Sequence, residues 1–269
     1  MGCNIELKHN ISSEITKSPF NNLEEIEIPD DFTNNARFPI IKQASNILHE
    51  KYDDKIPFIA TIMGPFTLLC QILSTGPEEL IKQLNKDIVG IEDSLYTLTT
   101  AIFEEIDFYK ELNIDIISIF EPYSSPSLLK PKFFQQNLQP FLEEISNKIY
   151  CPSLLHICGD TTPILKNMLT SGFEGVIISD NVDISNAKQL QAELNTKTRI
   201  CGNVSTAKTL FMKNEKEVYD ETMKILSNGI DILSPGCMIS PNTPLNNLKK
   251  IIKARNDFCN LSNEKSYDN

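Results

Sequence analysis

Six short apolar runs, separated by longer segments with helical periodicity, constrain the fold of this chain more than any other feature. Most of the runs are apolar on consecutive residues and contain β-branched side chains, as expected of strands that are covered on both faces. Strict alternation of strands and helices predicts a parallel sheet with right-handed crossovers. The predicted strands are Phe58–Met63, Asp115–Phe120, Ser153–Ile157, Gly175–Ser179, Thr198–Cys201 and Ile230–Ser234.

The segments between these runs carry apolar residues spaced by three and four, the pattern of an amphipathic helix. Asn242-Thr243-Pro244 places a capping residue before a proline, and Asn228-Gly229 supplies a glycine that ends a helix. Residues 1–55 are polar and irregular apart from one predicted helix, and residues 258–269 form a polar tail. The predicted helices are Ile40–Lys51, Ile88–Leu112, Pro131–Lys148, Pro163–Leu169, Ile184–Leu194, Glu215–Leu226 and Pro244–Ala254.

Two architectures accommodate this alternation, a doubly wound open sheet and a (β/α)8 barrel. No G-x-G-x-x-G segment follows a predicted strand, which disfavours a dinucleotide-binding sheet. The barrel is favoured, although a closed barrel of this type needs eight strands. We therefore expect residues 1–257 to form a single α/β domain, a TIM-type barrel that is incomplete and has six recognisable strands.

Charge and composition exclude several classes of partner. The chain has 36 acidic and 25 basic residues, a formal net charge of −11 and only three arginines, which argues against nucleic acid or an anionic membrane as the main partner. The longest apolar stretch, Phe58–Leu73, is too short to span a bilayer. Seven cysteines are an odd number, so we expect a cytoplasmic protein with free thiols rather than a disulfide scaffold.

Candidate functional residues gather where the predicted strands end, because the active site of a barrel lies at the carboxyl ends of its strands. His156 and Cys158 are two residues apart and therefore face the same side of an extended chain. Cys237 follows the last predicted strand. One histidine and two cysteines at the barrel mouth would form a zinc site with an open fourth position. The alternatives are ordinary buried side chains, or a redox pair of Cys158 and Cys237.

Several of these strand ends resemble a known family. The segments are Gly64–Thr67 (GPFT), Leu155–Pro163 (LHICGDTTP), Cys201–Val204 (CGNV), Ser234–Cys237 (SPGC) and Thr243–Asn247 (TPLNN). They resemble the uroporphyrinogen decarboxylase superfamily, and within it most closely the corrinoid:coenzyme M methyltransferases of methylotrophic methanogenesis. The His-x-Cys and Pro-Gly-Cys elements are the most specific part of this resemblance.

The resemblance implies a (β/α)8 barrel whose first two strands have no counterpart here, so we expect a chain truncated at its N-terminus relative to the family. A separate N-terminal fragment is one partner that this truncation suggests. The resemblance also implies a zinc ion bound by His156, Cys158 and Cys237. The implied reaction moves a methyl group from a methylated corrinoid (methylcobalamin), carried on a partner protein, to the thiol of coenzyme M.

Four further residues at strand ends are candidates for the site. Glu121 is expected to act in catalysis, as a zinc ligand in the absence of substrate or by orienting the thiol; a salt bridge or a helix cap is the alternative. Asp180 and Asn203 are expected to line the substrate pocket, although a turn residue is the simpler reading of Asp180. Asp160 is expected to cap the following helix or to brace His156.

Other functions stay open from the sequence. A uroporphyrinogen decarboxylase binds a substrate with many carboxylates and needs several arginines in its cleft, whereas the three arginines here are scattered. A truncated chain that binds zinc or the corrinoid protein without catalysis is a further alternative. The methanol, methylamine and methyl sulfide branches are not separated by these segments. For the sulfonate of coenzyme M the sequence offers Arg37, or the backbone amides and hydroxyls near Thr161-Thr162.

Overall fold

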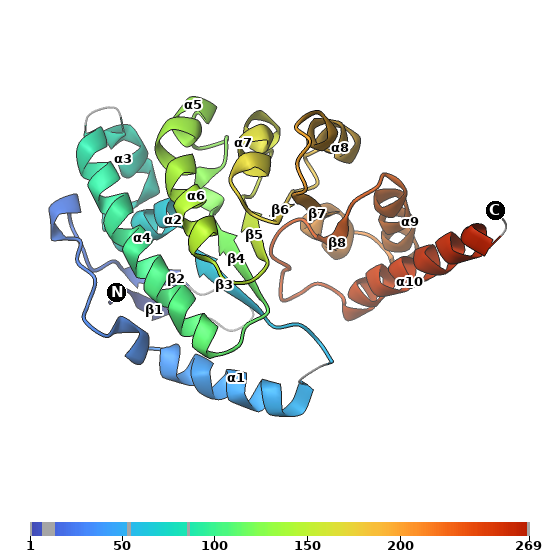
Figure 1. The fold of residues 1–269 in the computed structure, drawn as a ribbon, viewed down its shortest axis with the longest axis horizontal. Helices are drawn as coiled ribbons and strands as arrows, with labels where there is room; N and C mark the ends of the chain where they lie inside the picture. Colours follow the sequence, from blue (N-terminus) through green and yellow to red (C-terminus); the bar gives the residue numbers. More distant parts are fainter. Residues whose placement is uncertain (1, 7–13, 53–54, 85–86, 268–269) are drawn as a thin grey trace.

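A curved parallel sheet of six strands forms the centre of the molecule (Figure 1). The computed structural model describes residues 2–6, 14–52, 55–84 and 87–267. In this part of the chain the strand order is β3-β4-β5-β6-β7-β8, the same as the order along the sequence. This confirms the prediction of an α/β fold with six parallel strands, two fewer than a closed barrel has. The strands are β3 Ile59–Met63, β4 Ile116–Phe120, β5 Ser153–His156, β6 Gly175–Ile177, β7 Arg199–Val204 and β8 Ile232–Pro235.

The helices that follow the strands lie against the sheet and against one another, with α4 beside α6, α7 beside α8 and α9 beside α10 (Figure 1). Each predicted helix coincides with a helical segment of the structure. The α-helices of more than three residues are α1 Phe38–Tyr52, α2 Pro65–Ile72, α3 Gly76–Gln83, α4 Ile88–Glu111, α6 Gln139–Lys148, α7 Leu165–Thr170, α8 Ile184–Glu193, α9 Glu215–Ser227 and α10 Leu245–Tyr267. The short ones are η1 Leu23–Glu25, η2 Phe32–Asn34, η3 Pro122–Ser124, α5 Pro131–Phe133, η4 Phe134–Leu138, η5 Thr162–Ile164 and η6 Thr206–Phe211.

The apolar core lies between the sheet and these helices. In α4 the residues Ile91, Leu95, Leu98, Ile102 and Ile106 recur every three or four positions, and each of them is buried. Strand β7 buries the consecutive residues Ile200 and Cys201, as the sequence predicts for a strand covered on both faces, whereas β5 buries Leu155 and leaves Leu154 half-buried. None of the described helices is long and apolar enough to cross a membrane.

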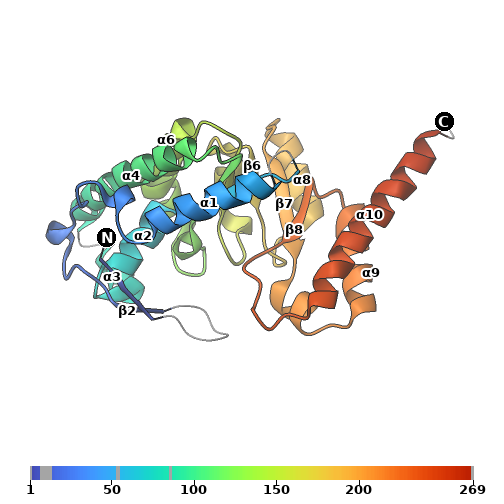
Figure 2. The ribbon, with the colours of Figure 1, turned by 90° about the horizontal axis from the view of Figure 1, so that it is seen from below.

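The N-terminal part is more ordered than the sequence predicts. Strands β1 (Asn4–Glu6) and β2 (Glu14–Lys17) pair antiparallel, where the sequence indicates irregular chain (Figure 2). The segment after β2 binds the end of α2, because the Phe20 N–H donates to the Ile72 carbonyl at 3.2 Å. At the other terminus α10 continues to Tyr267 and so includes most of the predicted polar tail; residues 268 and 269 lie outside the described residues.

The sheet ends in two unpaired edges within the described residues, β3 on one side and β8 on the other. Ile59, Thr61 and Met63 alternate along one exposed face of β3, and Ile232 of β8 is exposed as well. A closed barrel would join these two edges through further strands. The open sheet therefore leaves apolar side chains uncovered at both of its edges.

Candidate metal centre

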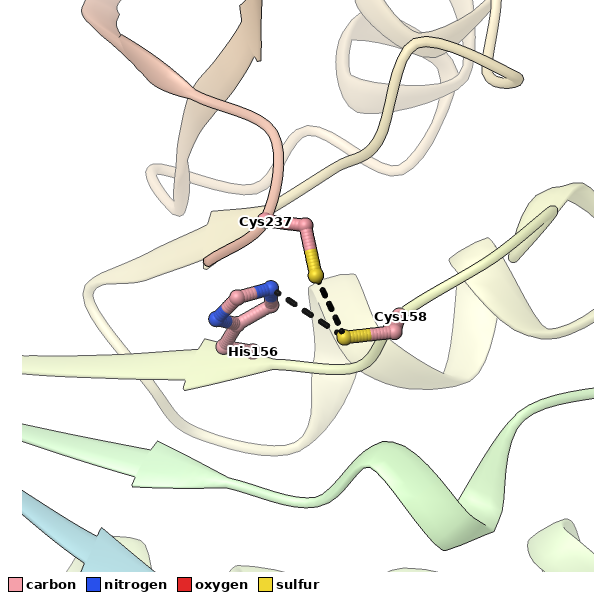
Figure 3. A group of neighbouring side chains, drawn as sticks. All are labelled: His156, Cys158 and Cys237. Atoms are coloured by element: carbon pink, nitrogen blue, oxygen red, sulfur yellow. Dashed lines mark hydrogen bonds between the residues drawn. The ribbon is translucent and has the colours of Figure 1, made fainter. Parts of the chain in front are cut away.

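His156, Cys158 and Cys237 point toward one another at the carboxyl end of the sheet (Figure 3). The Cys158 Sγ lies 3.1 Å from the Cys237 Sγ and 3.7 Å from the His156 Nε2. One potential ligand atom from each of the three side chains lies within 4.8 Å of the others, and no second group of this kind occurs among the described residues. The structure thus brings together the three residues that the sequence singles out.

Two glycines shape the chain beside the cysteines. Gly159 has φ +84, a conformation that favours glycine, and it turns the chain directly after Cys158. Gly236 packs so closely against the end of β6 that a Cβ atom there would lie 3.0 Å from the Ser179 Cα and 3.2 Å from the Ile178 carbonyl oxygen. This close packing holds the end of β8, and with it Cys237, near the end of β5, although β6 and β7 lie between these two strands in the sheet.

The three side chains form a donor set suited to zinc. Contact with Cys158 and with His156 lowers the pKa of Cys237 to about 4, and the resulting thiolate raises the pKa of Cys158. The Phe120 ring packs against the imidazole of His156 at a centroid distance of 4.9 Å and limits its orientation. Ligands of a tetrahedral zinc ion stand roughly 3.5–3.8 Å apart. The three residues therefore fit such an ion after the two sulfur atoms separate by less than about 1 Å.

Comparison with known proteins assigns the family. Residues 1–258 match the family model described as uroporphyrinogen decarboxylase (URO-D). The chain belongs to this family. It is 32% identical over 260 residues to the methylcobamide:CoM methyltransferase MtaA of Methanosarcina barkeri, an alignment that covers 96% of this chain and 76% of that relative. It is 28% identical over 276 residues to the methylcobamide:CoM methyltransferase MtbA of Methanosarcina acetivorans, which covers 96% of this chain and 75% of that relative.

A solved structure supports the same placement. A methyltransferase from Methanosarcina mazei superposes with a TM-score of 0.90 at 31% sequence identity, covering 96% of this chain and 76% of that one. The likeness confirms an incomplete TIM-type barrel. Within the URO-D family the chain is a methyltransferase of the branch that contains MtaA and MtbA.

Glu121 lies beside the metal centre, because its backbone N–H donates to the His156 carbonyl at 2.8 Å, but its carboxylate binds the first turn of α2. It accepts hydrogen bonds from the Phe66 N–H at 3.0 Å, the Thr67 N–H at 2.7 Å and the Thr67 hydroxyl. These N–H groups are unpaired within α2 because they lie in its first turn. Burial raises the pKa of Glu121 to about 7, although the hydrogen bonds from Thr67 and Phe66 lower it. The structure therefore places this side chain as a helix cap and not among the three grouped ligands, and its catalytic role stays a prediction.

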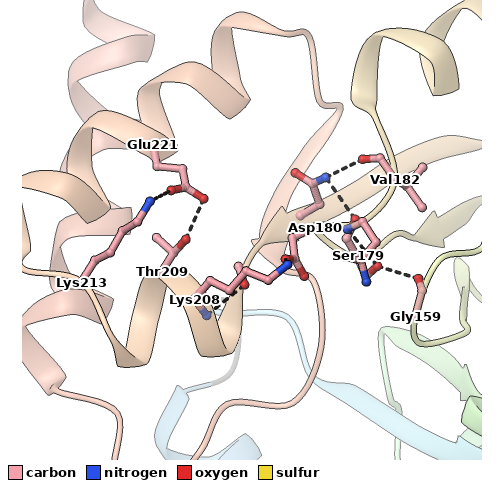
Figure 4. A network of polar contacts seen from close by, with 11 residues as sticks. Gly159, Ser179, Asp180, Val182, Lys208, Thr209, Lys213 and Glu221 are labelled. Carbon is pink, nitrogen blue, oxygen red and sulfur yellow. Dashed lines mark hydrogen bonds and ion pairs between the residues drawn. The ribbon is translucent and has the colours of Figure 1, made fainter.

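The other predicted site residues follow the carboxyl ends of β5, β6 and β7, and Asp180 is labelled in Figure 4. Asn203 is buried and donates to the carbonyls of Ser179 and Val182 at 3.1 and 3.0 Å. Asp180 is an exposed residue in the turn after β6, and its carboxylate forms an ion pair with Lys208. Asp160 is exposed, and its carboxylate accepts the Thr162 N–H at 3.0 Å.

These contacts refine what the sequence suggests for the three residues. The hydrogen bond of Asp160 is local and reaches the first residue of η5, although Thr161 and not Asp160 is the N-cap residue of that helix. The amide of Asn203 fixes the loop after β6, with both of its donors used inside the protein. A role in lining a substrate pocket stays a prediction for Asp180 and Asn203.

Sequence reasoning missed two residues that hold this end of the sheet together. The Ser179 hydroxyl donates to the Gly159 carbonyl at 2.6 Å and so links the loop after β6 to the loop after β5. Lys208, in the short helix after β7, forms the ion pair with Asp180 (Figure 4). Ser179 is the last residue of a predicted strand, and this position is the signal that could have identified it; Lys208 lies further beyond the predicted strand Thr198–Cys201 and carries no comparable signal.

Proposed function

We propose that this protein transfers a methyl group from a methylated corrinoid to the thiol of coenzyme M, with a zinc ion held by His156, Cys158 and Cys237. The methyl group leaves the cobalt and bonds to the sulfur, so the products are methyl-coenzyme M and the reduced corrinoid. The proton of the thiol passes to solvent. The observation that carries the proposal is the meeting of three ligand atoms within 4.8 Å at the carboxyl end of the sheet.

The similarity to the methylcobamide:CoM methyltransferases supports the choice of substrates. Their name pairs a methylated corrinoid with coenzyme M, and we infer that the corrinoid reaches this chain on a partner protein that covers the mouth. Zinc with an open fourth position would supply a Lewis acid that keeps the substrate sulfur as a thiolate at neutral pH.

The chain's own residues position the reaction. His156 and Cys158 approach from the end of β5 and Cys237 from the end of β8, so these residues would hold the ion at the carboxyl end of the sheet, where both substrates could reach it. The Phe120 ring packs against the imidazole of His156 and restricts its orientation. Bringing the two reactants together at one point converts their encounter into an oriented step.

The free edges of β3 and β8 are relevant to the N-terminal fragment that the sequence suggests as a partner. A separate N-terminal fragment stays a prediction, and these two edges are where its strands would pair. Pairing there would cover the exposed side chains of Ile59, Met63 and Ile232.

The test combines zinc content with demethylation of methylcobalamin that depends on coenzyme M. We expect close to one zinc per chain and measurable turnover in the wild type, with both lost in His156→Ala, Cys158→Ser and Cys237→Ser. Cys259→Ser is the matched control, because Cys259 is an exposed free thiol on α10. Zinc without turnover in the wild type would favour binding without catalysis. Full zinc content in the three ligand variants would overturn the site.

A further inference from the structure

Lys208 is a cation at the same end of the sheet as the proposed zinc ligands. It lies in η6, directly after β7, and β7 is the neighbour of the strand that ends before Cys237. Its Nζ lies 2.9 Å from the Asp180 Oδ2, and its side chain is 69% exposed, against 28% for Asp180 (Figure 4). The ammonium group is therefore held in place by Asp180 and still open to solvent.

The loop that holds Lys208 contacts the chain beside both cysteines. The Ser179 hydroxyl donates to the carbonyl of Gly159, the residue that follows Cys158. Gly236, which precedes Cys237, lies so close to the same loop that a Cβ atom on it would be 3.3 Å from the Asp180 nitrogen. Residues 179 and 180 thus pack against the residue after Cys158 and the residue before Cys237, which places the turn that holds Lys208 beside the chain of both cysteines.

Two other basic residues, Arg37 and Lys213, are less suitable for binding a substrate at the metal centre. Arg37 directly precedes α1, and both ends of α1 lie at the amino ends of the strands. The Phe38 ring packs 5.0 Å from that of Phe108, near the end of α4 that leads into β4, and the His49 ring packs 4.2 Å from that of Phe58, just before β3. Arg37 is therefore on the side away from the metal centre. Lys213 is engaged by the Glu221 carboxylate, which also accepts from the Thr209 hydroxyl (Figure 4).

We propose that Lys208 forms the subsite for the anionic end of the thiol substrate and donates a hydrogen bond to its sulfonate. This inference rests on the proposed function. A sulfonate stays charged at neutral pH and carries oxygen acceptors, which an exposed ammonium group can bind on its flexible stem. Because the ammonium group has three donors, it can keep Asp180 as a partner and still donate to the substrate. Asp180 is then a positioning residue that acts through Lys208.

The test measures binding of two thiols to the zinc-loaded protein by titration calorimetry. Coenzyme M is compared with 2-mercaptoethanol, which has a hydroxyl group in place of the sulfonate. We expect the wild type to bind coenzyme M about tenfold more tightly, Lys208→Ala to lose this preference and Lys208→Arg to keep it. Added salt should reduce the preference of the wild type, because it screens an exposed ion pair.

Lys216→Ala is the matched control, because Lys216 is exposed on α9 and its loss changes the net charge equally. It should keep the preference of the wild type for coenzyme M. An unchanged preference in Lys208→Ala, or an equal loss of affinity for both thiols, would overturn the subsite. Binding of neither thiol by the zinc-loaded wild type would overturn the proposed function, and this inference with it.

Discussion

The titration of Glu121 should make the wild type less stable as the pH rises from 4.5 to about 7, and Glu121→Gln should lack this contribution. The Glu121 side chain is 1% exposed, and burial raises its pKa to about 7 from an ordinary value of 4.5. Between these two values the folded protein keeps the proton that the unfolded chain releases. Because the folded state then binds more protons, the free energy of unfolding falls as the pH rises. Gln does not titrate, so the variant lacks this contribution.

The size of the effect follows from the two pKa values. The difference between pKa values of 4.5 and about 7 corresponds to about 3 kcal/mol in the free energy of unfolding. This contribution to stability is fully present below pH 4.5 and is lost by about pH 7. Burial also raises the pKa of Glu105 to about 7, but Glu105 is present in both proteins and cancels in the comparison. The quantity to follow is therefore the difference in unfolding free energy between the wild type and Glu121→Gln.

Urea unfolding followed by circular dichroism, at several pH values from about 4.5 to about 8, measures this difference. Relative to the variant, the wild type should lose about 3 kcal/mol across that range. Glu104→Gln, at an exposed position of α4, controls for the loss of one carboxyl group. A wild type that gains stability over the variant with rising pH would refute the reasoning. The hydrogen bonds from Phe66 and Thr67 would then outweigh burial.

Three further perturbations test neighbouring contacts. Gly64→Ala should lower the free energy of unfolding by roughly 1–3 kcal/mol, because the new Cβ would overlap the Glu121 Oε2. Urea unfolding should show a smaller loss when Gly64→Ala is made in a Glu121→Ala background. An equal loss in that background would contradict the overlap. Asn203→Ala leaves two carbonyls without their donor and should cost about 2 kcal/mol in thermal unfolding, so an unchanged Tm would count against it. Burial acts against the ionised form of Asp231, but the Ile200 N–H and Lys188 lower its pKa below 3.8. The stability that wild type holds over Asp231→Asn should therefore shrink as the pH falls below 3.8, and a difference independent of pH would exclude this contribution.

The strands and the three grouped ligands are predictable because each depends on a local pattern. Consecutive apolar residues identify buried strands wherever polar residues follow them, as at Phe120-Glu121 and His156. The pattern predicts β3 but not α2, because the apolar run continues from Phe58 to Leu73 with little polar interruption and periodicity does not separate a strand from a short helix within it. The hairpin of β1 and β2 escapes for the opposite reason, since the described side chains of its strands are exposed and carry no buried pattern.

The functions of single polar residues at the mouth are less predictable. Glu121 meets Thr67 across 54 residues, and Lys208 meets Asp180 across 28. Position at a strand end indicates that such a side chain lies near the site, but its partner depends on how neighbouring loops pack. Glu121 illustrates this, because the same strand end that suggests a metal ligand lies next to the unpaired N–H groups of α2.

The two sulfur atoms of the candidate centre lie 3.1 Å apart, yet they belong to residues separated by 79 positions. During synthesis the ribosome releases His156 and Cys158 well before Cys237, so the cluster of three forms only after the last strand has docked. In refolding, too, a bifunctional thiol-reactive reagent that must bridge both sulfurs would react only after β5 and β8 have joined the same sheet. Its reaction time would report when the carboxyl-terminal half of the sheet acquires its curvature.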